Sequence, residues 1–376
     1  MTFTDADAPI PEFVTDVQGF QALENDWGKL YESSEEATVF QSFAWNFIWW
    51  KHFGHKLGRR LCLLVFRSPL TSEIVGLAPL MRTLWYATPL VRLSFIGTGT
   101  SDYLDVLAAP DAKPRIMDAF YRAIENISWS IADFQQLRAT GVVMAQSPPP
   151  IANYDYLDVF LERCPYVKLL GSWSDLLLSL GKKTRSNVNY YERNVAKTHD
   201  VEYKRVEDES EIPKEMHRLF QLHQRRWNER WLPGVFGSSG IRHFHSEVAI
   251  ALARVDALRL FCLRLDGETQ ASLYCFKSRG RMMYYQGGFE PTLSKYSLGT
   301  ILTGYALRQA LEEGLPVFDF LRGNEPYKAK WTQESETNSR RFVTRRKYRL
   351  IGLVRKVQRI EESVELRAKA WARSRR

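Results

Sequence analysis

The densest group of reactive side chains follows the apolar run VFDFL, which predicts a buried strand. Loops at the ends of such strands in α/β sheets commonly build functional sites. There a carboxylate can accept a proton, a phenol can donate one and an ammonium group can bind an anion. A structural ion pair between Asp319 and Arg322 is an equal alternative to a catalytic Asp319. The group consists of Asp319, Arg322, Glu325, Tyr327, Lys328 and Trp331.

A second group lies in the helical stretch LFQLHQRRW, residues 219–227. His223 and Trp227 are four residues apart and therefore share a helix face, beside Arg226. A histidine at this place can act as a general base. A packed core histidine explains the pattern somewhat better, so His223 is a secondary candidate.

A third group lies in the basic stretch GKKTRSNVNYYERNVAKTHDVEYKR, residues 181–205. Arg185 and Asn187 can bind a phosphate or another anionic headgroup. A solvated helix face is the equal alternative. In the first half of the chain, Asp102, Tyr103 and Asp105 form a further polar stretch. Two carboxylates at this spacing do not by themselves indicate a glycosidase pair.

Two stretches of the chain repeat one order of predicted elements, which would position these groups. Each reads as a β-hairpin, a third strand, a helix and a fourth strand. Two copies of one α/β module are the economical interpretation, and a single mixed sheet with accidental similarity is the alternative. The segments are 60–66, 74–82, 90–97, 114–127 and 131–137 in the first stretch, and 259–265, 270–278, 281–289, 298–314 and 317–323 in the second.

Three prolines in AQSPPPIANYDY, residues 145–156, predict a junction between the modules, because proline disrupts regular structure. We therefore expect an N-terminal module over residues 10–165 and a C-terminal module with the reactive groups over 166–345. A basic amphipathic tail over 346–376 follows.

Composition excludes several classes of protein. The chain has 376 residues, 45% of them hydrophobic, and is long enough for a large core in about two domains. Its four cysteines lie far apart, which excludes a zinc ribbon or a disulfide scaffold and suits a reducing cytosol. No metal site is expected. Without a signal peptide or an apolar run near 20 residues, we expect a cytoplasmic protein, peripheral to the inner membrane at most.

Positive charge is concentrated at the C-terminus. Residues 340–376 contain 14 Lys and Arg and three acids. The net positive charge of this segment is therefore larger than the +9 of the whole chain. This distribution argues against a uniformly basic DNA-binding surface. Within the tail, the apolar residues at helical spacing predict a basic amphipathic helix that packs on the body, attaches to an anionic membrane or, least favoured, contacts RNA. These apolar residues are Leu350, Leu353, Val354, Val357, Ile360 and Val364.

The chain resembles the CelD/BcsL-like, or BioF2-like, acetyltransferases of the GNAT superfamily, which are related to the FemABX transferases. The matching segments cover nearly the whole chain except the tail. The last of them is the most specific. They are FQSFAWNFIWWKHFG (40–54), DYLD (102–105), LFQLHQRRW (219–227) and YSLGTILTGYALRQALEEGLPVFDFLRGNEPYKAKW (296–331).

The resemblance implies an α/β fold with mixed sheets, built as a tandem duplication of two GNAT-like modules. It also implies acyl-CoA or acetyl-CoA as co-substrate, with no permanently bound cofactor, and an amine acceptor from lipid or polysaccharide biosynthesis. The phosphate-binding loop of the family is only partly present, because Gly299 is its one glycine. The residues expected to hold the cofactor are Gln286, Gly287, Ser297, Gly299 and Thr300.

Within that resemblance the reactive residues acquire roles. Glu325 would accept the ammonium proton, with Asp319 and His223 as other catalytic candidates, and Tyr327 or Tyr285 would protonate the leaving thiolate. The residues expected to bind substrate are Arg185, Asn187, Arg226, Trp227, Arg322, Lys328, Trp331, Asp102 and Tyr103.

Two other functions remain open at this point. An aminoacyl-tRNA-dependent transferase of the FemABX type would use Lys182, Lys183, Arg185 and the tail to bind RNA, with strong salt dependence. A non-catalytic module that scaffolds polysaccharide synthesis would tolerate loss of Glu325 and Lys328.

Overall fold

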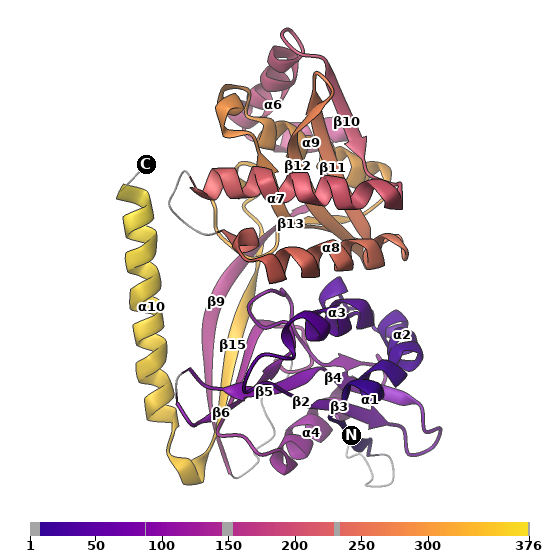
Figure 1. Ribbon diagram of the computed structural model, residues 1–376, viewed down its shortest axis with the longest axis vertical. Helices are drawn as coiled ribbons and strands as arrows, with labels where there is room; N and C mark the ends of the chain where they lie inside the picture. Colours follow the sequence, from indigo (N-terminus) through magenta and orange to yellow (C-terminus); the bar gives the residue numbers. More distant parts are fainter. Residues whose placement is uncertain (1–7, 87, 145–152, 229–233, 375–376) are drawn as a thin grey trace. The chain divides into compact units, whose positions relative to one another are not determined.

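The computed structural model describes residues 8–86, 88–144, 153–228 and 234–374, and the side chains of the last ten of these only in part. Most of the predicted 145–156 junction lies outside them. The chain forms two compact units, unit 1 from residues 1–162 with 337–376, and unit 2 from residues 163–336 (Figure 1). Strands β9 (Tyr154–Lys168) and β15 (Ser335–Arg345) carry the chain across this division.

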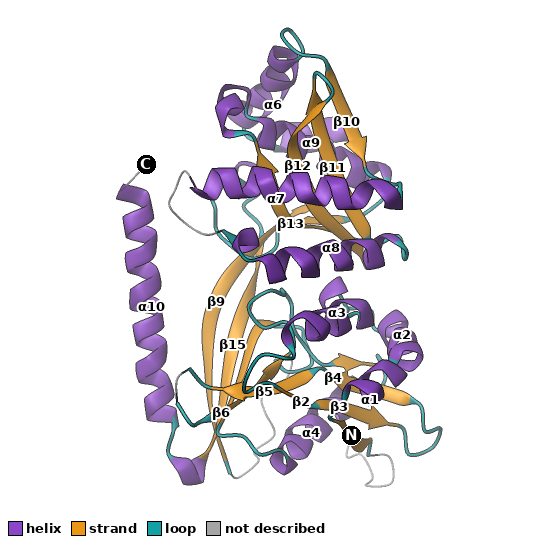
Figure 2. Cartoon of the chain, viewed as in Figure 1, coloured by secondary structure: helices purple, strands orange, loops and turns teal. Residues whose placement is uncertain are grey.

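Unit 1 contains a four-stranded antiparallel sheet in the order β1-β3-β4-β7 and a second group of strands in the order β9-β15-β8-β6-β5-β2. Helices cover both (Figure 2). Its other elements are β1 (Ile10–Val14), α1 (Val17–Ala22), α2 (Glu24–Ser33), α3 (Phe43–Phe53), β2 (Arg60–Leu61), β3 (Leu63–Arg67), β4 (Ile74–Ala78), β5 (Leu80–Leu84), β6 (Val91–Phe95), β7 (Leu107–Ala108), α4 (Lys113–Ala123), β8 (Ile131–Arg138) and α10 (Ile351–Ser374).

Unit 2 contains strands in the order β10-β11-β12-β13-β14-β9. Helices α7 and α8 pack on one face, and α6 and α9 on the other (Figure 1). Its other elements are α5 (Trp173–Ser179), α6 (Lys182–Val195), β10 (Val201–Arg205), α7 (Ile212–Asn228), α8 (Ser239–Ala253), β11 (Leu258–Leu265), β12 (Glu268–Ser278), β13 (Arg281–Phe289), α9 (Leu298–Glu312) and β14 (Val317–Asp319).

The repeat expected from the sequence is present in the strand pairing. In unit 1, β6 is followed by α4 and then by β8, which lies parallel to β6 and antiparallel to β15. In unit 2, β13 is followed by α9 and then by β14, which lies parallel to β13 and antiparallel to β9. The fold is a tandem of two α/β units with mixed sheets, as predicted.

The first predicted hairpin is broken into four strands. The 60–66 segment is interrupted at Cys62 and the 74–82 segment at Pro79, so the halves pair in different sheets. Pro79 has no backbone N–H and cannot donate in a strand ladder. Apolar runs show where a strand lies but not where it changes sheets.

The C-terminal boundary of unit 2 differs from the expected one. We predicted residues 166–345 for the second module, but residues 337–345 belong to unit 1. There β15 pairs with β8. Arg340 contacts the buried carboxylate of Asp133 at 2.7 Å, and Arg341 contacts Asp158 at 2.7 Å. These arginines, counted in the basic tail from sequence, form internal ion pairs.

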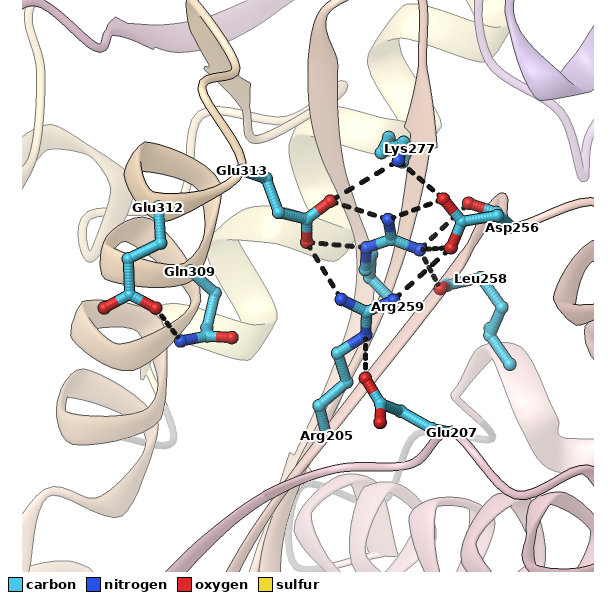
Figure 3. Close-up of polar contacts among 9 residues, drawn as sticks. All are labelled: Arg205, Glu207, Asp256, Leu258, Arg259, Lys277, Gln309, Glu312 and Glu313. Carbon is cyan, nitrogen blue, oxygen red and sulfur yellow. Dashed lines mark hydrogen bonds and ion pairs between the residues drawn. The ribbon is translucent and has the colours of Figure 1, made fainter.

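An ionic cluster joins the strands of unit 2 to the end of α9 (Figure 3). Arg259 is 1% exposed and its guanidinium lies between two carboxylates, Glu313 at 2.6 Å and Asp256 at 2.9 Å. Lys277 and Arg205 contact the same two acids. The two carboxylates stabilise the buried Arg259 guanidinium, whose removal from water without a counter-charge would destabilise the fold.

Candidate functional site

A pocket of about 200 Å³ lies in unit 2 where β13 ends and α9 begins. It combines aromatic walls with hydroxyl groups, one guanidinium and a helix N-terminus. Its lining residues are Arg226, Tyr284, Phe289, Ser294, Ser297, Leu298, Gly299, Thr300, Thr303, Tyr327 and Trp331.

The strand arrangement opens the sheet at this pocket. β14 pairs with β13 only from Arg281 to Met283, opposite Val317 to Asp319. On its other side β14 pairs with β9, and this pairing continues past Asp319, where the Phe320 N–H donates to the carbonyl of Pro165. The pairing with β14 therefore ends before Tyr284, beside the pocket. An extended ligand can add to a strand edge of this kind through main-chain hydrogen bonds.

A β-bulge in β13 decides which tyrosine faces the pocket. Cys275 pairs with Tyr284 and Tyr274 with Gln286, so Tyr285 is the extra residue. Tyr285 packs on the α8 side, with its hydroxyl 3.5 Å from the ring of His245. Tyr284, which sequence reasoning missed, lines the pocket instead. Simple alternation gives no signal for a bulge.

Two phenols lie together in the pocket wall. The hydroxyl groups of Tyr327 and Tyr284 are hydrogen-bonded to each other. Burial raises the pKa of both phenols, and the nearby Glu325 carboxylate adds to the increase. Both side chains are therefore protonated at neutral pH and available as proton donors.

Positive charge reaches the pocket from two directions. The Arg226 guanidinium, from α7, lies 4.8 Å from the centre of the Phe289 ring. The first turn of α9 contributes Leu298 and Gly299, whose backbone N–H groups have no carbonyl four residues earlier to bind. A Cβ at Gly299 would lie 3.2 Å from the Phe289 ring, so a larger residue would crowd the opening.

Lys328 has a structural role in the loop that carries Tyr327. Its ammonium group, 4% exposed, donates to the Arg322 carbonyl at 2.7 Å and lies 3.3 Å from that of Gly323. It also contacts the Glu325 carboxylate at 2.9 Å. The predicted substrate-binding lysine thus fixes the loop, and the half-exposed Glu325 is held near both phenols.

Asp319 and His223 are buried outside the pocket lining. Asp319 pairs with Arg281 at 3.1 Å and accepts a hydrogen bond from the Leu321 N–H, so its carboxylate has structural partners. His223 bonds Gln286, and burial lowers its pKa to about 4. A neutral histidine packed against Phe236 at 4.9 Å is the core residue that we regarded as the better alternative.

Several predicted ligand-binding residues also lie outside the pocket lining. Gly287 is in β13 and Trp227 packs against His223 on α7. Arg185 and Asn187 lie on α6, whose buried residues Val188 and Val195 pack in the core of unit 2. Arg322 contributes its carbonyl to Lys328.

The polar stretch 102–105 lies in unit 1 and serves its packing. Tyr103 is buried under the guanidinium of Arg138, and Asp102 is buried beside it. Asp105 accepts hydrogen bonds from the backbone N–H groups of Val106, Val142 and Val143, while burial raises its pKa to about 6.

Unit 1 has a pocket of about 190 Å³ at the place in its own fold that matches the pocket of unit 2. It lies at the start of α4 and the end of β8. Its lining includes the acids Glu35, Glu36 and Asp105 and the cations Lys113 and Arg138, and Lys113 pairs with Glu36 at 2.7 Å. The proline near the start of α4 removes a backbone donor there.

Three of the five predicted cofactor-binding residues line the pocket of unit 2, together with Arg226, Tyr327 and Trp331 from the other groups. The lining residues that sequence reasoning missed are Tyr284, Phe289, Ser294, Leu298 and Thr303. Their only available signal was their position beside the strand–loop–helix segment. Within the described residues, no group of three or more His, Cys, Asp and Glu side chains could hold a metal ion.

Residues 182–329 match the acetyltransferase (GNAT) domain family. No curated protein matches the chain. Among solved structures, the chain is similar to FemX, with 10% identity, a TM-score of 0.60, and coverage of 88% of this chain and 96% of that one. L-PGS from Bacillus licheniformis has 12% identity, a TM-score of 0.53, and coverage of 91% and 94%.

The structural likenesses establish the fold, and the family match covers the α6-to-loop segment that builds the pocket. The C-terminal domain (DUF2156) of a putative lysylphosphatidylglycerol synthetase from Agrobacterium fabrum is also similar, with 11% identity, a TM-score of 0.54, and coverage of 86% and 92%. The chain is therefore an enzyme of the N-acyltransferase class, with an acetyltransferase (GNAT) domain at residues 182–329 in a tandem of two GNAT-like units.

Proposed function

We propose that the chain transfers an acyl group from a coenzyme A thioester to an amine of a cell-envelope precursor. The observation that supports this most is the opened edge of β13 beside the N-terminus of α9, with Tyr284 in the wall. An extended pantetheine arm can pair with the strand edge, while the N–H groups of Leu298 and Gly299 face its pyrophosphate.

The chemistry requires no covalent intermediate on the enzyme. The amine nitrogen forms a bond to the thioester carbon, the carbonyl electrons move to oxygen, and collapse of this oxyanion breaks the C–S bond. Tyr284 donates its proton to the departing thiolate, and the second proton that the attacking nitrogen loses restores the Tyr284 phenol, directly or through water. The two hydrogen-bonded phenols suit this step because their raised pKa values keep them protonated.

The acceptor enters as an ammonium group and must lose a proton before it attacks. In this proposal the Glu325 carboxylate accepts this proton from the ammonium group, directly or through water. Lys328 fixes the Glu325 side chain near the two phenols. The Glu325 side chain is 54% exposed, which leaves a path for the proton to solvent.

The acceptor class rests on the resemblance to the CelD/BcsL-like family. We propose a lipid long-chain base or an amino sugar of a polysaccharide, modified at the cytoplasmic face of the inner membrane. Within the described residues, no helix combines the length and apolar character that crossing a bilayer requires.

The competing donor is an aminoacyl-tRNA, bound through Lys182, Lys183 and Arg185. These side chains are exposed or half-exposed on α6. Binding through them would weaken steeply with salt. A pocket that holds a thioester by main-chain contacts would respond much less.

The test is calorimetric binding of coenzyme A, acetyl-CoA and palmitoyl-CoA, below its micelle concentration, to the wild type and to Gly299→Trp. We expect binding that the tryptophan abolishes. Gly304→Ala is the matched control, because a Cβ there meets Trp173, Trp331 and Val188 only at ordinary distances of 3.6–3.8 Å.

Palmitoyl-CoA binding alone would indicate a lipid acyltransferase, and equal binding of all three would favour acetylation of an amino sugar. Absence of all binding would refute the CoA hypothesis. The tRNA-dependent reaction would then be tested with charged tRNA, and the scaffold by complementation with Glu325→Gln.

A further inference from the structure

Helix α10 has two separate apolar faces, although its sequence reads as one stripe. Val354 is fully buried among Trp85, Ile131 and Phe342 of unit 1, with Leu350 and Val357 packed beside it. On the neighbouring face, Leu353 is 41%, Ile360 62% and Val364 60% exposed. These three positions are seven and four residues apart, so they follow one line along the helix. Packing on unit 1 therefore leaves an apolar stripe at the surface.

Positive charge surrounds this part of the helix, and Lys356 and Arg367 lie within about 60° of the exposed stripe. Five basic side chains of this segment are exposed and form no ion pair among the described residues: Arg349, Arg355, Lys356, Arg359 and Arg367. Of the acids in the described part of the helix, Glu361 contacts Arg340 at 2.8 Å and also bonds Tyr86. Among the acids of α10 whose side chains the structure describes, Glu362 is then left to offset the cations.

We infer that the exposed Leu353–Ile360–Val364 stripe of α10 and its flanking cations bind an anionic lipid bilayer, with the helix lying in the plane of the surface. An apolar stripe suits the boundary between headgroups and acyl chains, and the cations suit anionic headgroups. A protein partner would match the apolar stripe but would not require the unpaired cations Lys356 and Arg367 that flank it.

The neighbouring, buried face of the helix makes this orientation specific. Glu361, Arg340 and Val354 attach α10 to unit 1, so the face that meets the bilayer is determined by the folded protein. The attachment is independent of the donor used by unit 2. An experiment can therefore refute membrane binding while the acyltransferase proposal stands, or refute the acyltransferase proposal while membrane binding stands.

The experiment is co-sedimentation of the full chain with vesicles of phosphatidylcholine, alone or mixed with phosphatidylglycerol. We expect binding only to the anionic vesicles, weakened by salt. Leu353→Ser with Ile360→Ser should reduce binding about tenfold or more. Lys356→Gln with Arg359→Gln should reduce it about fivefold per cation.

Lys182→Gln with Lys183→Gln is the charge-matched control on unit 2 and should bind vesicles as the wild type does. Equal binding to neutral and anionic vesicles, or full binding by the serine variant, would overturn the inference. Binding of free tRNA without binding of vesicles would overturn it in favour of RNA.

A second measurement covers the case in which the serine variant unfolds. Bimane attached at Ile360→Cys should shift to the blue on addition of anionic vesicles, because the stripe enters an apolar environment. The same label at Glu362→Cys, about 200° away around the helix, should not shift. The four native cysteines are buried, which favours selective labelling. Identical responses at the two sites would refute the stated orientation.

Discussion

The hydroxyl groups of Tyr327 and Tyr284 are hydrogen-bonded to each other, and they are the two phenols in the lining of the unit 2 pocket. The neighbouring Tyr285 lies across the sheet beside His245. The pair gives a direct test of which phenol serves the reaction.

Tyr284→Phe should lower kcat by about 100-fold or more, because the leaving thiolate loses its proton donor. Tyr285→Phe is the matched control and should change kcat little. Steady-state kinetics with the acyl-CoA that binds would check both. The reverse order of effects would place the reaction on the other face of β13.

Removal of the Lys328 ammonium should act on folding as well as on rate. Lys328→Met leaves the carbonyls of Arg322 and Gly323 without their buried donor and frees the Glu325 carboxylate. We expect a loss of about 2 kcal/mol in the free energy of unfolding, measured in urea. Glu325→Gln should keep most of that stability but reduce kcat, which separates the structural residue from the proposed base.

Arg259→Met should cost about 3 kcal/mol in the free energy of unfolding, because it leaves two carboxylates without the cation between them (Figure 3). The guanidinium holds the pKa of Glu313 below its usual value. The contribution of the Arg259–Glu313 pair to the free energy of unfolding is thus complete above the unfolded Glu313 pKa near 4.5. It is lost as pH falls through the lower folded pKa.

The difference between wild type and Arg259→Met should therefore shrink in acid, as followed by urea unfolding over a pH series. Arg254→Met is the control, since its exposed pair with Glu209 contributes little. A difference that stays constant with pH would contradict the electrostatic explanation.

His223 should influence stability below neutral pH and leave the activity profile unchanged. Its folded pKa is about 4, because burial opposes the charged form. The unfolded chain binds that proton near 6.5, so stability falls as pH drops from about 6.5 to 4, by roughly 3 kcal/mol. His223→Gln should flatten this decrease. A large loss of kcat in that variant at neutral pH would restore His223 as a catalytic candidate.

Adjacent residues of α10 should behave differently in unfolding experiments. Val354→Ser places a hydroxyl in a buried contact with Trp85 and Phe342, and should cost about 2 kcal/mol. Leu353→Ser should leave the thermal midpoint nearly unchanged, because the side chain is already 41% exposed. Equal effects would indicate that α10 packs through a different face.

The sequence by itself determined the order of the repeated elements, the helix at α9 and the group of side chains after β14. Apolar periodicity and turn residues are local signals, and they were sufficient for these features. The expectation that Ser297, Gly299 and Thr300 hold a cofactor came from the family resemblance, and the structure places all three in the lining of the unit 2 pocket.

Tertiary structure alone decided which side chains meet. The bulge in β13 reverses the alternation and brings Tyr284 to the pocket in place of Tyr285, and no single residue type marks a bulge. Likewise, β15 returns to unit 1 and converts Arg340 and Arg341 from apparent tail charges into buried ion pairs. Long-range strand pairing determines both outcomes, because burial and partners depend on segments far away in the chain.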